Sequence, residues 1–247
     1  MREQHTLPED KSPGTSTLAS GPAGTHFEAQ VAASYMLAML AGAPARGLPG
    51  ASIDRVALQQ ANAGYPLDDV IIHGHDNISG KVAVLEVQVK RSITFAASDP
   101  VFRKVVGQIV KASQRPDFST QRYELAIATT KGSRKIDGAY QDVLTLARQI
   151  SDATTFAAQI DLAGVANDDM RSFVKTFKTH LLDEGSPDDN ETVWFLLRRI
   201  QILTFDFTAP GSASHDLALE RALRILHADD GSRVGAFWGS LIELSID

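Results

Sequence analysis

Residues 68–91, DDVIIHGHDNISGKVAVLEVQVKR, contain the pattern that decides the fold. Two runs rich in Val, Ile and Leu flank the segment DNISG, which predicts an antiparallel hairpin with residues 77–80 as its turn. This turn sets the following pairs across the hairpin: Asp76 with Lys81, Ile71 with Glu86, and Asp69 with Gln88. The hairpin therefore brings a carboxylate on one strand next to a polar side chain on the other.

Successive side chains of a strand point to opposite faces, so this register also sorts the two faces of the hairpin. One face carries the polar residues Asp69, Glu86, Gln88 and Lys90. The other carries the apolar residues Val70, Ile72, Ala83, Leu85, Val87 and Val89. A slip by one residue would mix the two sets. The register favours Asp69 over Asp68 on the polar face, and a bulge would reverse that choice. The polar residues have a second interpretation, as the solvated face of an amphipathic strand.

Outward from the hairpin, the periodicity predicts an α/β (α+β) fold with a mixed sheet flanked by helices. The expected elements between residues 24 and 150 are helices 25–40, 101–112 and 137–150 and strands 53–59, 68–75, 81–90 and 122–130. Thr25 and Glu28 have the spacing of a capping box at the first helix. A mainly helical extension is expected over residues 151–247, with helices 168–182, 191–200, 215–227 and 233–244 and a strand at 202–207. Residues 1–23 are expected to form a disordered leader.

Composition and charge exclude several classes of function. The chain has 247 residues and no cysteine, which excludes disulfides, thiolate metal sites and cysteine nucleophiles. Its longest mostly apolar run, residues 31–43, is too short to cross a bilayer, so a cytoplasmic protein is expected. The net charge is −6, yet residues 81–135 contain 11 Lys or Arg against 4 Asp or Glu. This basic segment either binds a polyanion or forms a solvated surface.

The polar face of the hairpin has the chemistry that metal-dependent phosphodiester hydrolysis needs. The carboxylate of Asp69 and the amide oxygen of Gln88 are hard ligands suited to Mg²⁺. Lys90 lies one pleat away, where an ammonium group can orient a water and stabilise developing negative charge. The hairpin is therefore a candidate nuclease site.

Asp69 followed by Gln88-x-Lys90 resembles the signature of PD-(D/E)xK nucleases, in the QxK variant of Mrr-like restriction enzymes. The resemblance implies a restriction-endonuclease-like core over residues 24–150. It implies Mg²⁺, which Mn²⁺ can replace, held by Asp69, Gln88, the Val89 carbonyl and Glu28. It further implies that Lys90 positions the attacking water and that Glu86 and Glu28 assist the metal or the water. The departure from the parent signature is Gln88, which supplies no negative charge.

Four segments together resemble a narrower group, the N-terminal double-stranded-DNA endonuclease domain of bacterial anti-phage proteins. The segments are GTHFEAQVAASYMLAMLAG (24–42), GYPLDDVII (64–72), LEVQVKRSITF (85–95) and WFLLRRIQILTFDF (194–207). Such domains are fused to SAVED sensors in CBASS effectors or to STAND NTPases of the Avs class. The resemblance implies a DNA endonuclease of little sequence specificity that acts as a homo-oligomer, with a sensor or NTPase domain C-terminal to it. The alternative is a catalytically silent module of the same fold that binds DNA or oligomerises.

Basic residues around this site are candidates for contacts with the DNA backbone. They are Arg91, Arg103, Lys104, Lys131, Arg134 and Lys135. For the loop 131–135, contact with phosphate and plain solvation are equally compatible with the sequence. His73 and His75 alternate onto the polar face of the hairpin, but two histidines without a further ligand nearby are typical of ordinary strand residues.

Overall fold

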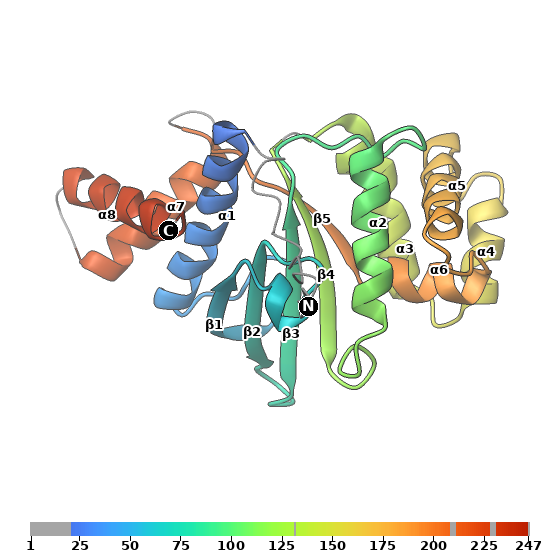
Figure 1. Cartoon of the computed structure of the whole chain (residues 1–247), viewed down its shortest axis with the longest axis horizontal. Helices are drawn as coiled ribbons and strands as arrows, with labels where there is room; N and C mark the ends of the chain where they lie inside the picture. Colours follow the sequence, from blue (N-terminus) through green and yellow to red (C-terminus); the bar gives the residue numbers. More distant parts are fainter. Residues whose placement is uncertain (1–20, 131, 208–210, 228–230, 247) are drawn as a thin grey trace, which may run out of the picture.

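The predicted hairpin forms the middle of the sheet in the computed structural model, which describes residues 21–130, 132–207, 211–227 and 231–246 (Figure 1). Its strands are β2 (Val70–Asp76) and β3 (Val82–Val89). The backbone N–H of Asp76 donates to the Lys81 carbonyl over 2.8 Å, and Ile71 lies opposite Glu86. The predicted register is therefore confirmed.

Three further strands complete a five-stranded mixed sheet in the order β1-β2-β3-β4-β5. They are β1 (Ala51–Leu58), β4 (Arg122–Thr129) and β5 (Ile200–Thr204). The first three strands are antiparallel, whereas β4 and β5 run parallel to β3. Parallel neighbours require a crossover connection, and the helix α2 (Pro100–Ser113) lies in the one between β3 and β4.

Helices cover both faces of the sheet, so the structure has two hydrophobic cores (Figure 1). One face carries α1 (Pro22–Leu40), α7 (Ala213–Leu226) and α8 (Gly231–Leu244). The other carries α2 with α3 (Gln141–Gln149), α4 (Ala153–Asp161), α5 (Asp168–Asp183) and α6 (Asn190–Leu197). The apolar set predicted for the hairpin packs as a whole into the core beneath α1. The fold is α+β, as predicted.

Several predicted boundaries are wrong. The helix α1 begins at Pro22 with Gly21 as its N-cap and no side-chain cap, so Thr25 and Glu28 form no capping box. Proline is well suited to the first helical position, and it starts the helix one turn early. Residues 22 and 23 thus belong to α1, whereas residues 1–20 of the expected leader lie outside the described residues.

The C-terminal half also differs from the sequence prediction. The helix α4 was not predicted, and β5 begins at Ile200, which the sequence placed in a helix. The helix expected over residues 137–150 is divided into a π-helix, Lys135–Tyr140, and α3. Short 3₁₀ geometry occurs at Ala61–Ala63. Within the described residues, no helix is long and apolar enough to cross a membrane.

Candidate active site

Asp69 brings three of the predicted residues together at the end of the hairpin. It immediately precedes β2 and is only 8% exposed. Its Oδ2 atom accepts a hydrogen bond from the Gln88 side-chain Nε2 and another from the backbone N–H of Val89, over 2.7 Å. The same oxygen lies 3.4 Å from the Lys90 Nζ atom. One carboxylate oxygen of Asp69 is therefore the common acceptor for the last two residues of β3 and for Lys90, which follows the strand.

Lys90 lies at the boundary between this buried group and solvent. Its backbone N–H donates to the Ala128 carbonyl over 2.8 Å, which continues the pairing of β3 with β4. Its Nζ atom donates to the Val89 carbonyl over 2.9 Å, and its side chain remains 25% exposed. The ammonium group is thus fixed close to Asp69 and still reaches water.

Glu28 approaches the same group from α1. Burial, and after it the negative charges of Asp69 and Asp68, raise the pKa of Glu28 from 4.5 to about 7. The positive charge of Lys90 acts in the opposite direction. Glu28 therefore lies within electrostatic reach of Asp69 and Lys90. Because α1 starts at Pro22, Glu28 is an ordinary helical residue whose side chain is available to this group.

Gln59 is a residue of the site that the sequence did not reveal. Its side-chain Nε2 donates to the Glu28 Oε1 atom, and its backbone N–H donates to the Asp69 carbonyl over 3.3 Å. It follows β1 with a φ of 52°, a left-handed conformation that is uncommon for residues other than glycine. Glutamine carries no sequence preference for this conformation, whereas glycine or asparagine there would have predicted the turn.

Asp68, the alternative to Asp69, lies at the margin of the group. It is half-buried, and burial together with the charge of Asp69 raises its pKa, while Lys90 and Lys104 lower it. Its carbonyl accepts from the Gln60 N–H over 3.0 Å. The side chain that contacts Gln88, Val89 and Lys90 belongs to Asp69, in agreement with the register.

Glu86 is separated from the other predicted site residues. It is fully buried, and its carboxyl group accepts hydrogen bonds from the Tyr123 hydroxyl and from the backbone N–H of Leu67 over 2.8 Å. Burial raises the pKa of Glu86 to about 7, although these two hydrogen bonds act to lower it. The helices α2 to α6 cover this part of the face, so the polar residues of β3 are not a solvated stripe. Glu86 instead anchors the segment that leads into Asp68 and Asp69.

The donor chemistry of the group suits a hard cation. The Gln88 Oε1 atom is buried without a hydrogen-bond partner among the described residues. Glu28 and Asp69 supply carboxylates and Val89 supplies a carbonyl oxygen. The described residues contain no cluster of three or more His, Cys, Asp or Glu side chains arranged to hold a metal. This donor set fits Mg²⁺, which is usually bound through one or two carboxylates and keeps several waters.

The predicted DNA-contact residues fall into three groups. Arg103 forms ion pairs with Asp183 and Glu184, and Lys135 pairs with Asp169 over 2.7 Å. The exposed side chains of Arg91, Lys104 and Arg134 form no ion pair with a described residue. Lys131 lies outside the described residues. Among these side chains without an ion pair, Lys104 lies near the site, because its charge lowers the pKa of Asp68.

The two histidines of β2 do not join this group. His73 Nε2 lies 2.8 Å from the Arg55 Nη2 atom, and His75 Nδ1 lies 3.0 Å from the Asp54 carboxylate. Burial and the charge of Arg55 lower the pKa of His73. Both histidines therefore interact with the edge strand β1.

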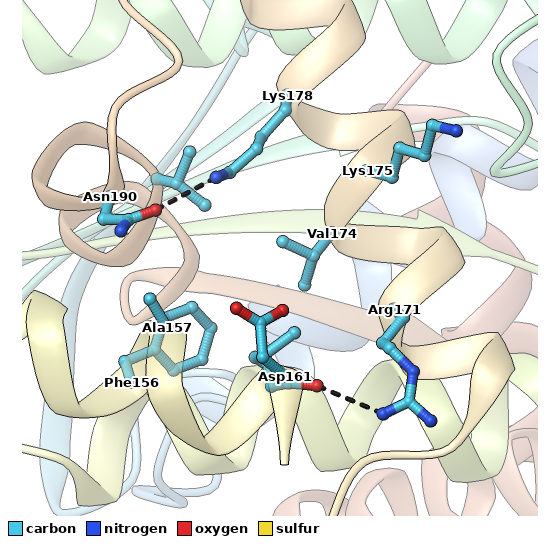
Figure 2. Close-up of a pocket in the computed structure, with 10 residues that line it drawn as sticks. Phe156, Ala157, Asp161, Arg171, Val174, Lys175, Lys178 and Asn190 are labelled. Carbon is cyan, nitrogen blue, oxygen red and sulfur yellow. Dashed lines mark hydrogen bonds between the residues drawn. The ribbon is translucent and has the colours of Figure 1, made fainter. Parts of the chain in front are cut away.

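A cavity of about 210 Å³ lies elsewhere, between α4, α5 and α6, and none of the predicted site residues lines it (Figure 2). Lys178 donates to the Asn190 side chain over 3.0 Å, and Arg171 donates to the Ile160 carbonyl. Its apolar floor includes Phe156 and Val174, which belong to the core beneath these helices. The cavity is thus a gap in helix packing with basic side chains at its rim.

Comparison of the chain with protein-family models, with curated proteins and with solved structures found no match.

Proposed function

We propose that this protein is a metal-dependent endonuclease that hydrolyses phosphodiester bonds of double-stranded DNA with little sequence specificity. The observation that carries the proposal is the convergence on Asp69 of Gln88, Val89 and Lys90, with Glu28 on α1 close enough for the charges of Asp69 and Lys90 to act on it. These are the residues of the QxK signature, and they meet at the end of the hairpin strands, where Lys90 remains open to solvent.

The residues of this chain would divide the chemistry among them. Asp69, Glu28, the Gln88 amide oxygen and the Val89 carbonyl would hold Mg²⁺ or Mn²⁺. The bound metal would neutralise negative charge on the scissile phosphate. Lys90 would orient the attacking water and stabilise the negative charge that develops on the phosphate. Arg91 and Lys104 are the exposed cations best placed to hold the DNA backbone beside it.

The resemblance to anti-phage effectors supplies the biological context of the proposal. The nuclease would act in anti-phage defence as a homo-oligomer in the cytoplasm, under the control of a C-terminal sensor or STAND NTPase domain. Two sites brought together would cut both strands, so the degree of self-association should set the rate of double-strand breakage.

A catalytically silent DNA-binding or oligomerisation module is the second candidate. Gln88 favours it, because an amide adds no negative charge to the metal site and its Nε2 atom, not its oxygen, contacts Asp69. This candidate predicts DNA binding without cleavage at any metal concentration.

The test is incubation of the purified protein with supercoiled plasmid and Mg²⁺ or Mn²⁺, beside Asp69→Asn and Lys90→Met. We expect metal-dependent nicking that each substitution reduces by about 100-fold or more, as loss of a group that stabilises transition-state charge does. Lys175→Met, which removes an exposed lysine from α5 outside the basic segment 81–135, is the matched control. A forcibly dimerised form of each protein is assayed in parallel.

Each outcome separates the candidates. Cleavage lost in both variants and kept in the control supports the nuclease. Binding without cleavage by the dimerised wild type supports the silent module. Equal cleavage by all proteins would exclude Asp69 and Lys90 as the site. Metal binding has its own readout: Mg²⁺ should raise the melting temperature of the wild type and not that of Asp69→Asn.

A further inference from the structure

A second cavity lies on the face of the sheet opposite α2 to α6. Its volume is about 460 Å³, within the range of about 300–1,000 Å³ that is usual for small-molecule sites. Its walls come from the second half of α1, the loop of residues 44–50, β5 with the segment after it, and α7. None of the proposed nuclease residues lines it.

Aromatic and aliphatic side chains form most of this cavity. Tyr35 meets Phe205 edge to face with ring centroids 6.1 Å apart, and Phe205 stacks on Phe207 at 5.8 Å. Leu217, which is 44% exposed, lines the cavity from α7. Such walls favour a ligand with an apolar or planar body, because burial of that body removes apolar surface from water.

Among the described residues, the charged side chains that line the cavity are two arginines, and none is Asp or Glu. The Arg46 Nη1 atom donates to the Thr204 carbonyl over 2.5 Å, and its guanidinium lies 4.7 Å over the Phe205 ring. These contacts fix the group and use only a part of its five N–H donors. The remaining donors are available to a ligand.

Arg221 is the second cation, and it has no hydrogen bond or ion pair within the described residues. It is half-buried on α7, and burial lowers the pKa of its guanidinium. Its neighbour Glu220 pairs with Arg224 over 2.5 Å. The charge of Glu220 acts on Arg221 in the opposite direction, without forming an ion pair with it. Arginine remains charged in proteins, so Arg221 is a cation beside an apolar wall that no described residue pairs with directly.

We propose that this cavity binds a small organic anion whose head group pairs with Arg46 and Arg221 and whose apolar body packs against Tyr35, Phe205 and Leu217. The combination excludes two simpler interpretations. An interior gap filled by neighbouring side chains would not carry two arginines that form no ion pair with a described residue. A contact for DNA phosphate would not need an aromatic wall, because the phosphate backbone is recognised through charge and hydrogen bonds.

The test is isothermal titration calorimetry with octanoate and 2-naphthoate, each compared with its uncharged amide. We expect at least one acid to bind more tightly than its amide, and the preferred acid identifies a straight-chain or an aryl body. Arg221→Gln should weaken the acids about tenfold or more, as loss of a hydrogen bond to a charged group does, and leave the amides unchanged. Arg233→Gln, at an exposed arginine on α8 and outside the cavity, should bind like the wild type.

The melting temperature of Arg221→Gln should equal that of the wild type, because no intramolecular hydrogen bond is lost. Failure of both acids to bind at millimolar concentration would overturn the proposal. Equal acid affinity in wild type and Arg221→Gln would also overturn it. So would loss of DNA binding by Arg221→Gln with acid binding unchanged, since Arg221 would then be a nucleic-acid contact. None of these outcomes depends on nuclease activity.

Discussion

Burial of the Glu86 carboxyl group should make the folded protein less stable as the pH rises. The pKa of Glu86 is raised from 4.5 to about 7 because the group is removed from water, and the hydrogen bonds from Tyr123 and Leu67 compensate only in part. In the folded state, Glu86 therefore keeps its proton in a pH range where the unfolded chain has lost it. Stability from this group is complete below pH 4.5 and is lost as the pH rises through about 7.

The size of the effect follows from the difference between the two pKa values. A difference of about 2.5, at about 1.36 kcal/mol for each pKa unit, corresponds to about 3 kcal/mol between pH 4.5 and pH 8. Glu86→Gln removes this titration and keeps the shape of the side chain. Its amide oxygen can accept from the Leu67 N–H, and its amide nitrogen can donate to the Tyr123 oxygen. We therefore expect the variant to be the more stable protein at pH 8 and to lose that advantage at pH 5.

Urea denaturation followed by tryptophan fluorescence measures this difference, with Trp194 and Trp238 as buried probes. The free energy of unfolding is compared between wild type and Glu86→Gln across pH 5 to 8. Glu28 also titrates near pH 7, but its contribution is common to both proteins and cancels in the comparison. Glu243→Gln, at an exposed position on α8, is the control. A difference between the proteins that does not change with pH would refute the argument that Glu86 is buried and neutral.

Three further predictions concern the site and its support. Gln59→Gly should relieve a left-handed backbone and stabilise the fold by about 1 kcal/mol in urea denaturation, whereas plasmid cleavage should fall because the contact with Glu28 is lost. Lys90→Met should raise the pKa of Glu28 above about 7, because the opposing positive charge is removed. NMR titration of the carboxyl groups measures this pKa, and the Glu28→Gln variant identifies the Glu28 signal. An unchanged titration would separate Lys90 from Glu28. Asp99→Ala should cost about 1–2 kcal/mol of stability, because its carboxylate accepts from the backbone N–H of Val101 at the start of α2 and from that of Thr94 in the preceding segment. Asp168→Ala, at an exposed carboxylate on α5, should cost much less in the same denaturation assay.

The hairpin and the grouping of side chains at its end were predictable because their information is local. Both strands alternate with period two, and the turn between them fixes the register, so pairing Asp76 with Lys81 already places Asp69 beside Gln88. The same pattern separated the polar side chains from the apolar set of the core beneath α1. The alternation along the sequence is sufficient to assign each side chain of the hairpin to a face, because a strand has only two faces.

What the sequence could not give depends on contacts between distant elements. The polar face of β3 was expected to share one environment, but α2 to α6 enclose Glu86 and leave Lys90 open. Tyr123, the partner of Glu86, comes from β4, and no local pattern relates the two. Gln59 was missed for a similar reason, since its conformation is imposed by contacts with α1 and with the segment before β2. The short helix α4 and the start of β5 were misjudged because neither has a strong period of its own.

Depth along the hairpin explains why acidic residues so close in sequence have different environments. Glu86 lies inside the core, where two hydrogen bonds satisfy its oxygens and its charge is unfavourable. Asp69 lies at the end of the sheet, where three donors converge on one of its oxygens. Glu28 and Asp68 then add carboxyl groups around a single lysine. Burial is the main cause that raises their pKa values, and the accumulation of negative charge with Asp69 adds to it. A bound cation would neutralise part of that negative charge. At Glu86 there is no such charge to neutralise, because the buried carboxyl group keeps its proton. The proposed metal site is therefore the end of the hairpin and not its interior, although the sequence pattern is continuous through both.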